Sequence, residues 1–340
     1  MSLSPKERLL HVVQKKKVDR PPVVCTGGMM NAAIVDVMKR TGHTLPEGHF
    51  SSELMAEISR DVHDDTGFEN FGIPFCMTVE AEVLGSEIDF GTLACEPKIA
   101  REVFPSVREV AFKDIGSMLD AGRIRTVAAA GERLAKAHPD GPVIGSLCGP
   151  ISTAASVVDP MQFLKELRKE REQAHRVLEY VSEFLIGFGR ILVESGASAI
   201  CIGDPTATGE ILGPRMFADY AVPYLNRVID GLHATGVPVL VHICGEMRAV
   251  KPSIPLLHAD AISTDAFVNL RLLKEEYPQL TTMGNVSTFL LELGEPDKVA
   301  RQTRALVKDG VDIISPACGL STSSPVANIR AMTETVKELR

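Results

Sequence analysis

Eight short apolar segments, separated by longer segments of helical character, constrain the fold of this 340-residue chain more than any other feature. Most are continuous apolar runs, the pattern of parallel strands that are buried on both faces. The eight segments are residues 22–26, 69–73, 143–147, 199–202, 239–243, 261–264, 281–283 and 312–315. An alternation of eight such strands with helices predicts an α/β fold, and it favours a TIM (β/α)8 barrel over an open doubly wound sheet.

Two additions to the simple barrel are expected. Ser4, Pro5 and Glu7 form a capping-box pattern, which predicts an N-terminal helix that continues to about Lys16. The connection between the second and third strands is too long for one helix, and we interpret it as a hairpin insertion beside the barrel mouth. No repeat, low-complexity tract or linker interrupts the chain, so residues 1–340 are expected to form a single domain.

The predicted hairpin insertion has two extended parts. Residues 77–83 alternate between apolar and polar side chains, as in a half-exposed antiparallel strand, and residues 87–93 follow a Gly-Ser turn. On this interpretation Glu80 and Glu82 lie on the solvated face of the hairpin.

Composition excludes several classes of function. The formal net charge is −8 and the isoelectric point is about 5.7, so no basic surface for nucleic acid is expected. No run of 18 apolar residues could span a membrane, and the N-terminal segment lacks the apolar core of a signal peptide. The seven cysteines are an odd number without a disulfide framework. We therefore expect a cytoplasmic protein with reduced thiols.

One histidine and two cysteines at predicted strand ends suggest a metal site. His242 and Cys244 are two residues apart, so on a strand both point to the same side, at the end where barrel enzymes carry their chemistry. Such a pair alone is more often a buried histidine packed beside a small cysteine. Cys318 follows the eighth strand in a loop that can lean across the mouth. One histidine and two cysteines form a common zinc ligand set, and three ligands leave a position open for substrate.

The two motifs HICG (242–245) and ISPACG (314–319) together resemble the HxC…C zinc motif of the methylcobamide:coenzyme M methyltransferases. These enzymes are a branch of the uroporphyrinogen decarboxylase superfamily of TIM barrels. Similarity to the superfamily continues through FENFGIPFCMTVEAEVLG, CIGDPTATGEILGPRMFADYAVPYL and MGNVSTFLLELG, and so covers most of the chain.

The resemblance implies a specific chemistry. Zn²⁺ held by His242, Cys244 and Cys318 would bind a small acceptor thiol such as coenzyme M as its thiolate. The thiolate would take the methyl group of a methylated corrinoid (methylcobalamin) that a partner protein carries.

Two carboxylates are candidate catalytic residues. Asp265 follows the sixth strand, where the methyltransferases place a carboxylate, usually Glu; it could bind the metal directly or support its ligands, and a helix cap is the alternative. Asp204 follows the fourth strand at an acidic position of the superfamily, where it could orient His242 or contact substrate. Its alternative is a turn aspartate before a proline.

Three polar residues are candidates for lining the substrate site. Asn31 lies in the loop after the first strand, and Asn285 and Ser287 follow the seventh. A plain turn is the alternative for Asn31, and a helix cap is the alternative for the other two.

Other functions remain open at this point. A corrinoid-dependent methyltransferase could use tetrahydrofolate as its acceptor. A uroporphyrinogen decarboxylase would need arginines for its many carboxylates, and the loop TGGMMN (26–31) has none where those enzymes resemble each other in an RxxGR-type motif. A non-catalytic corrinoid-protein-binding module with a structural zinc would more often have four protein ligands.

Overall fold

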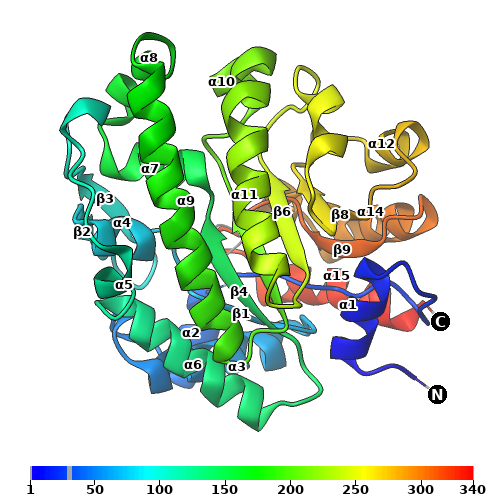
Figure 1. Ribbon diagram of the computed structural model, residues 1–340. Helices are drawn as coiled ribbons and strands as arrows, with labels where there is room; N and C mark the ends of the chain where they lie inside the picture. The colour runs from blue at the N-terminus through cyan, green and yellow to red at the C-terminus, as the bar shows by residue number, and fades with distance from the viewer. Residues whose placement is uncertain (1, 29–32, 340) are drawn as a thin grey trace.

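The computed structural model describes residues 2–28 and 33–339, and a parallel sheet that curls toward a barrel lies at its centre (Figure 1). In chain order its strands are β1 (Phe71–Ile73), β4 (Val143–Cys148), β5 (Ala199–Gly203), β6 (Val239–Ile243), β7 (Ala261–Thr264), β8 (Thr282–Val286) and β9 (Ile313–Pro316). Each strand pairs in parallel with the next. This order confirms the predicted TIM-barrel fold and seven of the eight expected strand positions.

The first predicted strand lies between β9 and β1 without forming a regular ladder. Val23 makes a single parallel bridge to Ile314 of β9. Toward β1, the Val23 amide donates to the Glu69 carboxylate (3.0 Å), and the side-chain amide of Asn70 bonds both the N–H and the C=O of Cys25 (2.8 and 2.7 Å). Backbone bonds also join the segment to both neighbours: the Val24 amide donates to the Ile314 carbonyl (3.0 Å), and the Glu69 amide donates to the Val23 carbonyl (2.9 Å). The segment therefore connects the two edges of the sheet through a few backbone and side-chain bonds and not through a continuous ladder.

Helices connect the strands and cover the outside of the sheet (Figure 1). The α-helices are α1 (Pro5–Val13), α2 (Val35–Thr41), α3 (Ser52–Thr66), α4 (Val79–Leu84), α5 (Ile115–Met118), α6 (Arg123–Ala137), α7 (Pro150–Val157), α8 (Pro160–Lys169), α9 (Arg171–Glu194), α10 (Gly209–Met216), α11 (Val222–His233), α12 (Leu270–Glu276), α13 (Thr288–Leu293), α14 (Pro296–Lys308) and α15 (Val326–Glu338). The N-terminal helix has the predicted capping box, because Ser4 Oγ accepts from the Glu7 amide and the Glu7 carboxylate accepts from the Ser4 amide.

The insertion between β1 and β4 contains the predicted hairpin, with a different first part. Its strands are β2 (Glu87–Asp89) and β3 (Lys98–Arg101), which pair antiparallel. Residues 77–83, predicted as a strand, instead contribute most of helix α4, which Gly85 ends at a φ of 114°. An alternating pattern of seven residues does not exclude a helix this short, and a glycine in the left-handed region is a common helix stop.

The helical conformation of this segment moves Glu80 out of the solvent. Glu80 is 2% exposed, and its Oε1 accepts from the Cys148 amide (2.8 Å). Burial raises the pKa of Glu80 to about 7. Glu82 is partly buried and forms an ion pair with Arg123. The prediction of two solvated carboxylates is therefore wrong.

None of the helices in the described ranges is both long and apolar enough to cross a membrane. None of the seven cysteines, all of which lie in described parts of the chain, forms a disulfide.

Candidate metal centre

The three candidate metal ligands come from two strand ends on the carboxyl side of the barrel. His242 lies on β6 and is fully buried, and Cys244 follows the last residue of that strand. The chain turns at Gly245, where φ is 68° and an added Cβ would lie 2.7 Å from the Glu210 carboxylate. Cys318 follows β9 by two residues. The turn and the strand ends position the three side chains toward one another.

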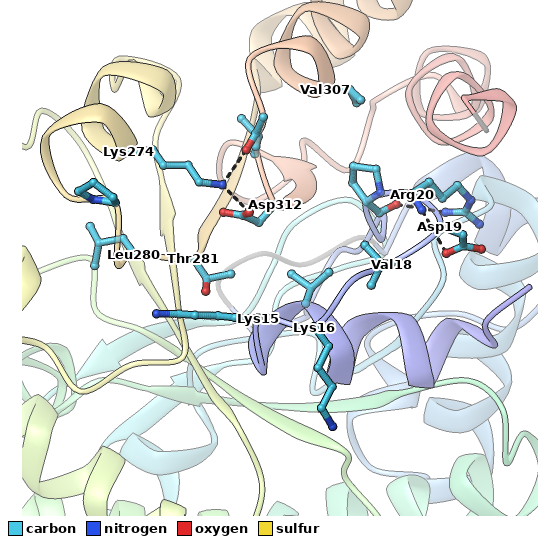
Figure 2. Close-up of a pocket in the computed structure, with 15 residues that line it drawn as sticks. Lys15, Lys16, Val18, Asp19, Arg20, Lys274, Leu280, Thr281, Val307 and Asp312 are labelled. Atoms are coloured by element: carbon cyan, nitrogen blue, oxygen red, sulfur yellow. Dashed lines mark hydrogen bonds and ion pairs between the residues drawn. The ribbon is translucent and has the colours of Figure 1, made fainter.

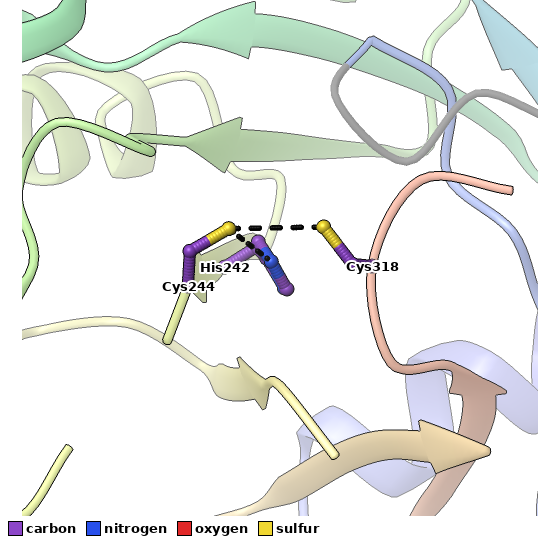
Figure 3. Close-up of side chains that lie close together, drawn as sticks. All are labelled: His242, Cys244 and Cys318. Atoms are coloured by element: carbon purple, nitrogen blue, oxygen red, sulfur yellow. Dashed lines mark hydrogen bonds between the residues drawn. The ribbon is translucent and has the colours of Figure 1, made fainter. Parts of the chain in front are cut away.

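Figure 3 shows the side chains of His242, Cys244 and Cys318 converging. Nε2 of His242 lies 3.3 Å from Sγ of Cys244, and the two sulfurs are 3.7 Å apart. The three ligand atoms all lie within 4.8 Å of one another. A tetrahedral zinc with Zn–S bonds of ~2.3 Å would place two sulfurs about 3.8 Å apart. Donor types and spacing therefore fit Zn²⁺, with one coordination position left for another ligand.

Ser263 on β7 contacts the other ring nitrogen of His242. Its Oγ lies 2.9 Å from Nδ1, and both residues are fully buried. The parallel register of β6 and β7 pairs His242 with Ser263, which brings the hydroxyl beside the ring. Metal-binding histidines usually bond a protein group through their second nitrogen, and that bond fixes the tautomer. The contact thus leaves Nε2 facing the cysteines.

Cys244 and Cys318 interact strongly as a pair. A hydrogen bond from the Cys244 thiol lowers the pKa of Cys318, because the donated hydrogen stabilises the Cys318 thiolate. The same bond raises the pKa of Cys244. One of the two sulfurs therefore loses its proton more readily than an isolated thiol does, which suits a metal ligand.

Asp265 lies near the three ligands but outside their cluster. It follows β7 and is partly buried, and its charge acts on Cys244. Its carboxylate is not among the atoms that lie within 4.8 Å of one another. The structure therefore places Asp265 near the ligands but outside the group of three mutually close ligand atoms.

Asp204 lies close enough to the ligands for its charge to act on Cys244. It is fully buried, and its carboxylate accepts hydrogen bonds from the amides of Ile151 (3.0 Å) and Ser152 (2.8 Å) and from the Ser152 hydroxyl (2.6 Å). These contacts cap the N-terminus of α7. Burial raises the pKa of Asp204 to about 6, although the same hydrogen bonds lower it.

Of the three expected lining residues, Asn31 lies outside the described residues. The Nδ2 group of Asn285 donates to the carbonyls of Asp265 and Val268, both at 2.8 Å, and so holds the loop after β7. Ser287 caps α13 by accepting from the Leu290 amide. The structure therefore places Asn285 and Ser287 in contacts with backbone groups.

A cavity of about 560 Å³ lies at the opposite end of the barrel (Figure 2). Thr281 and Asp312, next to the amino ends of β8 and β9, line it together with Lys15 and Lys274. The two lysines already bond neighbouring groups: Lys15 donates to the Gln279 carbonyl, and Lys274 donates to Asp312. This cavity is separate from the metal site.

The described residues also bring His43, Glu57 and Asp61 together. His43 Nδ1 lies 2.7 Å from the Asp61 carboxylate, and Arg60 pairs with both carboxylates. Because Arg60 already pairs with both carboxylates, we assign no metal to this group.

The sequence did not indicate the contact of Ser263 with His242, and it wrongly predicted that Glu80 is exposed to solvent. Ser263 lies 21 residues after His242 and no motif connects the two. Only the register of β6 against β7 shows the contact.

Comparison with known proteins shows relatives that span the whole chain. The sequence model described as uroporphyrinogen decarboxylase (URO-D) matches residues 4–339. The chain is 31% identical over 339 residues to the methylcobamide:CoM methyltransferase MtbA of Methanosarcina acetivorans, covering 99% of this chain and 98% of the relative. It is 28% identical over 331 residues to MtaA of Methanosarcina barkeri, covering 96% of each. A solved methyltransferase structure from Methanosarcina mazei, 27% identical, superposes with a TM-score of 0.93 over 99% of both chains.

Proposed function

Because the chain belongs to the uroporphyrinogen decarboxylase family and, within it, to the methylcobamide:CoM methyltransferases, we propose that it moves a methyl group from a methylated corrinoid to the sulfur of coenzyme M. The observation that carries this proposal is the convergence of His242, Cys244 and Cys318 at the carboxyl end of the barrel. Histidine and thiolate ligands with an open position are typical of catalytic rather than structural zinc. The reduced cysteines agree with an enzyme that works in the cytoplasm.

In this proposal His242 Nε2 and the sulfurs of Cys244 and Cys318 hold the zinc. When bound, the metal would lower the pKa of the acceptor thiol, so that the acceptor is a thiolate at neutral pH. We propose Asp265 as the nearby carboxylate that supports the site, since its charge acts on Cys244.

Other residues position these groups. Ser263 holds the His242 ring through Nδ1, so that the lone pair of Nε2 is directed toward the sulfurs. The hydrogen bond between the cysteines keeps their sulfurs close before any metal binds. For Asp204 we propose a structural function, because its carboxylate is occupied by the N-terminus of α7.

The transfer itself is a displacement at carbon. The acceptor sulfur forms a bond to the methyl carbon, and the cobalt–carbon bond of the corrinoid breaks. Both electrons of the broken bond remain on the cobalt, which leaves as cobalt(I). The acceptor thiol's proton is released to solvent. We propose that the corrinoid is carried by a partner protein, which presents it at the barrel mouth.

The proposal is tested with purified protein, methylcobalamin and three acceptors in parallel: coenzyme M, homocysteine and tetrahydrofolate. We expect demethylation of the corrinoid with coenzyme M, about one zinc per chain, and loss of both in His242→Ala and Cys318→Ala. Intact methylcobalamin with all three acceptors would refute methyl transfer. If only tetrahydrofolate supports turnover, the methyl acceptor is a pterin and not a thiol.

A further inference from the structure

The three most exposed large apolar side chains among the described residues all lie on the two segments that follow β7 and β8. Phe267 is 78% exposed, Leu293 77% and Phe289 74%, whereas the other exposed large apolar side chains range from 41% to 64%. Single exposed apolar side chains are ordinary, but several in one place usually mark a binding surface.

These residues lie on segments at the same end of the barrel as the metal site. The loop that bears Phe267 follows β7, and helix α13, which bears Phe289 and Leu293, follows β8. The two strands are neighbours in the sheet, so both segments leave the same end of the barrel. Phe289 and Leu293 are four residues apart and therefore share one face of the helix.

Contacts connect both segments to the loops that carry the ligands. Phe267 lies three residues after Thr264, which pairs in the sheet with Ile243, the residue before Cys244. In α13, Glu292 accepts a hydrogen bond from Ser321 (2.7 Å), three residues after Cys318. The apolar side chains are therefore attached to the immediate surroundings of the ligands.

The Phe267 loop is held in place rather than free to fold inward. Asn285 donates to the carbonyls of Asp265 and Val268, on either side of Phe267. Residues 266–269 carry no charge, and the single charge in α13 belongs to Glu292. The surface is thus fixed, apolar and nearly uncharged in a chain whose net charge is −8.

We propose that Phe267, Phe289 and Leu293, here called the apolar rim, seat the corrin ring of the methyl donor; this inference rests on the proposed function. The interior of an eight-stranded barrel is filled by side chains, so a macrocycle must lie on the mouth of the barrel and point its methyl group toward the metal ligands. A corrin has methyl groups on its edge and neutral amide side chains around it. These groups match an apolar surface without charge, and burying the two phenyl rings against them favours binding.

The test uses free methylcobalamin as the probe, with coenzyme M as acceptor. Phe267→Ser and Phe289→Ser should each raise the KM for methylcobalamin roughly tenfold, and the double variant more. The zinc content and the KM for coenzyme M should stay at the wild-type values. Leu256→Ser is the matched control, because Leu256 is 56% exposed and precedes the amino end of β7.

The outcomes separate this inference from the proposed function. If the wild type demethylates methylcobalamin and the double variant keeps its KM within twofold, the rim is not the corrin seat. If the variants change only the oligomeric state in sedimentation, the rim is an interface between two copies of the chain. If the wild type does not demethylate methylcobalamin with any acceptor, the proposed function fails and this inference fails with it.

Discussion

Ser263→Ala tests whether the residues around the metal ligands are organised for zinc. The substitution removes the hydroxyl that lies 2.9 Å from Nδ1 of the fully buried His242. A buried donor left without its partner costs roughly 1–3 kcal/mol. The cost falls on the zinc-bound state, because only there must Nδ1 carry the proton. We therefore expect zinc to bind about 10- to 100-fold more weakly, in agreement with other losses of support around metal-binding histidines.

The zinc affinity is measured by competition with a chromophoric chelator, and the free energy of unfolding by denaturant titration of the metal-free protein. Ser182→Ala is the matched control, because Ser182 is fully buried in α9 and its hydroxyl has no hydrogen-bond partner among the described residues. We expect the control to keep the wild-type zinc affinity. A Ser263→Ala variant that binds zinc as tightly as the wild type would refute the positioning of His242 by Ser263.

Two further predictions concern buried carboxylates. The pKa of Glu80 is raised from 4.5 to about 7. Between pH 4.5 and about 7 the folded state therefore binds more protons than the unfolded chain. The protein loses roughly 3 kcal/mol of stability as the pH rises through this range. Glu80→Gln should therefore be more stable than the wild type at pH 8 and about as stable at pH 4, and substitution of the exposed Glu179 by Gln is the control. If the free energy of unfolding, measured by denaturant titration, depends on pH in the same way in Glu80→Gln and in the wild type, the prediction is contradicted. Asp204→Ala removes the acceptor for the Ile151 and Ser152 amides at the start of α7 and should lower the free energy of unfolding by about 3 kcal/mol, and an unchanged denaturation midpoint would contradict that assignment.

The sequence was sufficient to predict the elements whose signals are local. Buried parallel strands are continuous apolar runs, so β6 and β7 have the predicted bounds. The two-residue spacing of His242 and Cys244 places them on one side of a strand whatever the rest of the fold. The resemblance to the methyltransferases then connected Cys318 to this pair.

Features that depend on contacts between distant segments could not be predicted. The first predicted strand joins its neighbours through a few backbone bonds and through the side chains of Glu69 and Asn70, and no local pattern indicates this. The alternation around Glu80 agreed with a strand, but the segment forms a short helix in which the Glu80 carboxylate accepts a hydrogen bond from the distant Cys148 amide. Asp204 bonds the Ile151 and Ser152 amides at the start of α7, and no motif near Asp204 indicates these contacts.

The central claim is that His242, Cys244 and Cys318 form one zinc site for methyl transfer. Its most direct test is metal analysis of the purified wild type and of Cys318→Ser, followed by the methylcobalamin and coenzyme M assay on the same samples. We predict about one zinc per wild-type chain with demethylation of the corrinoid, and loss of both in the variant. Wild-type protein that demethylates methylcobalamin without zinc, or a zinc-free variant that remains active, would contradict the account.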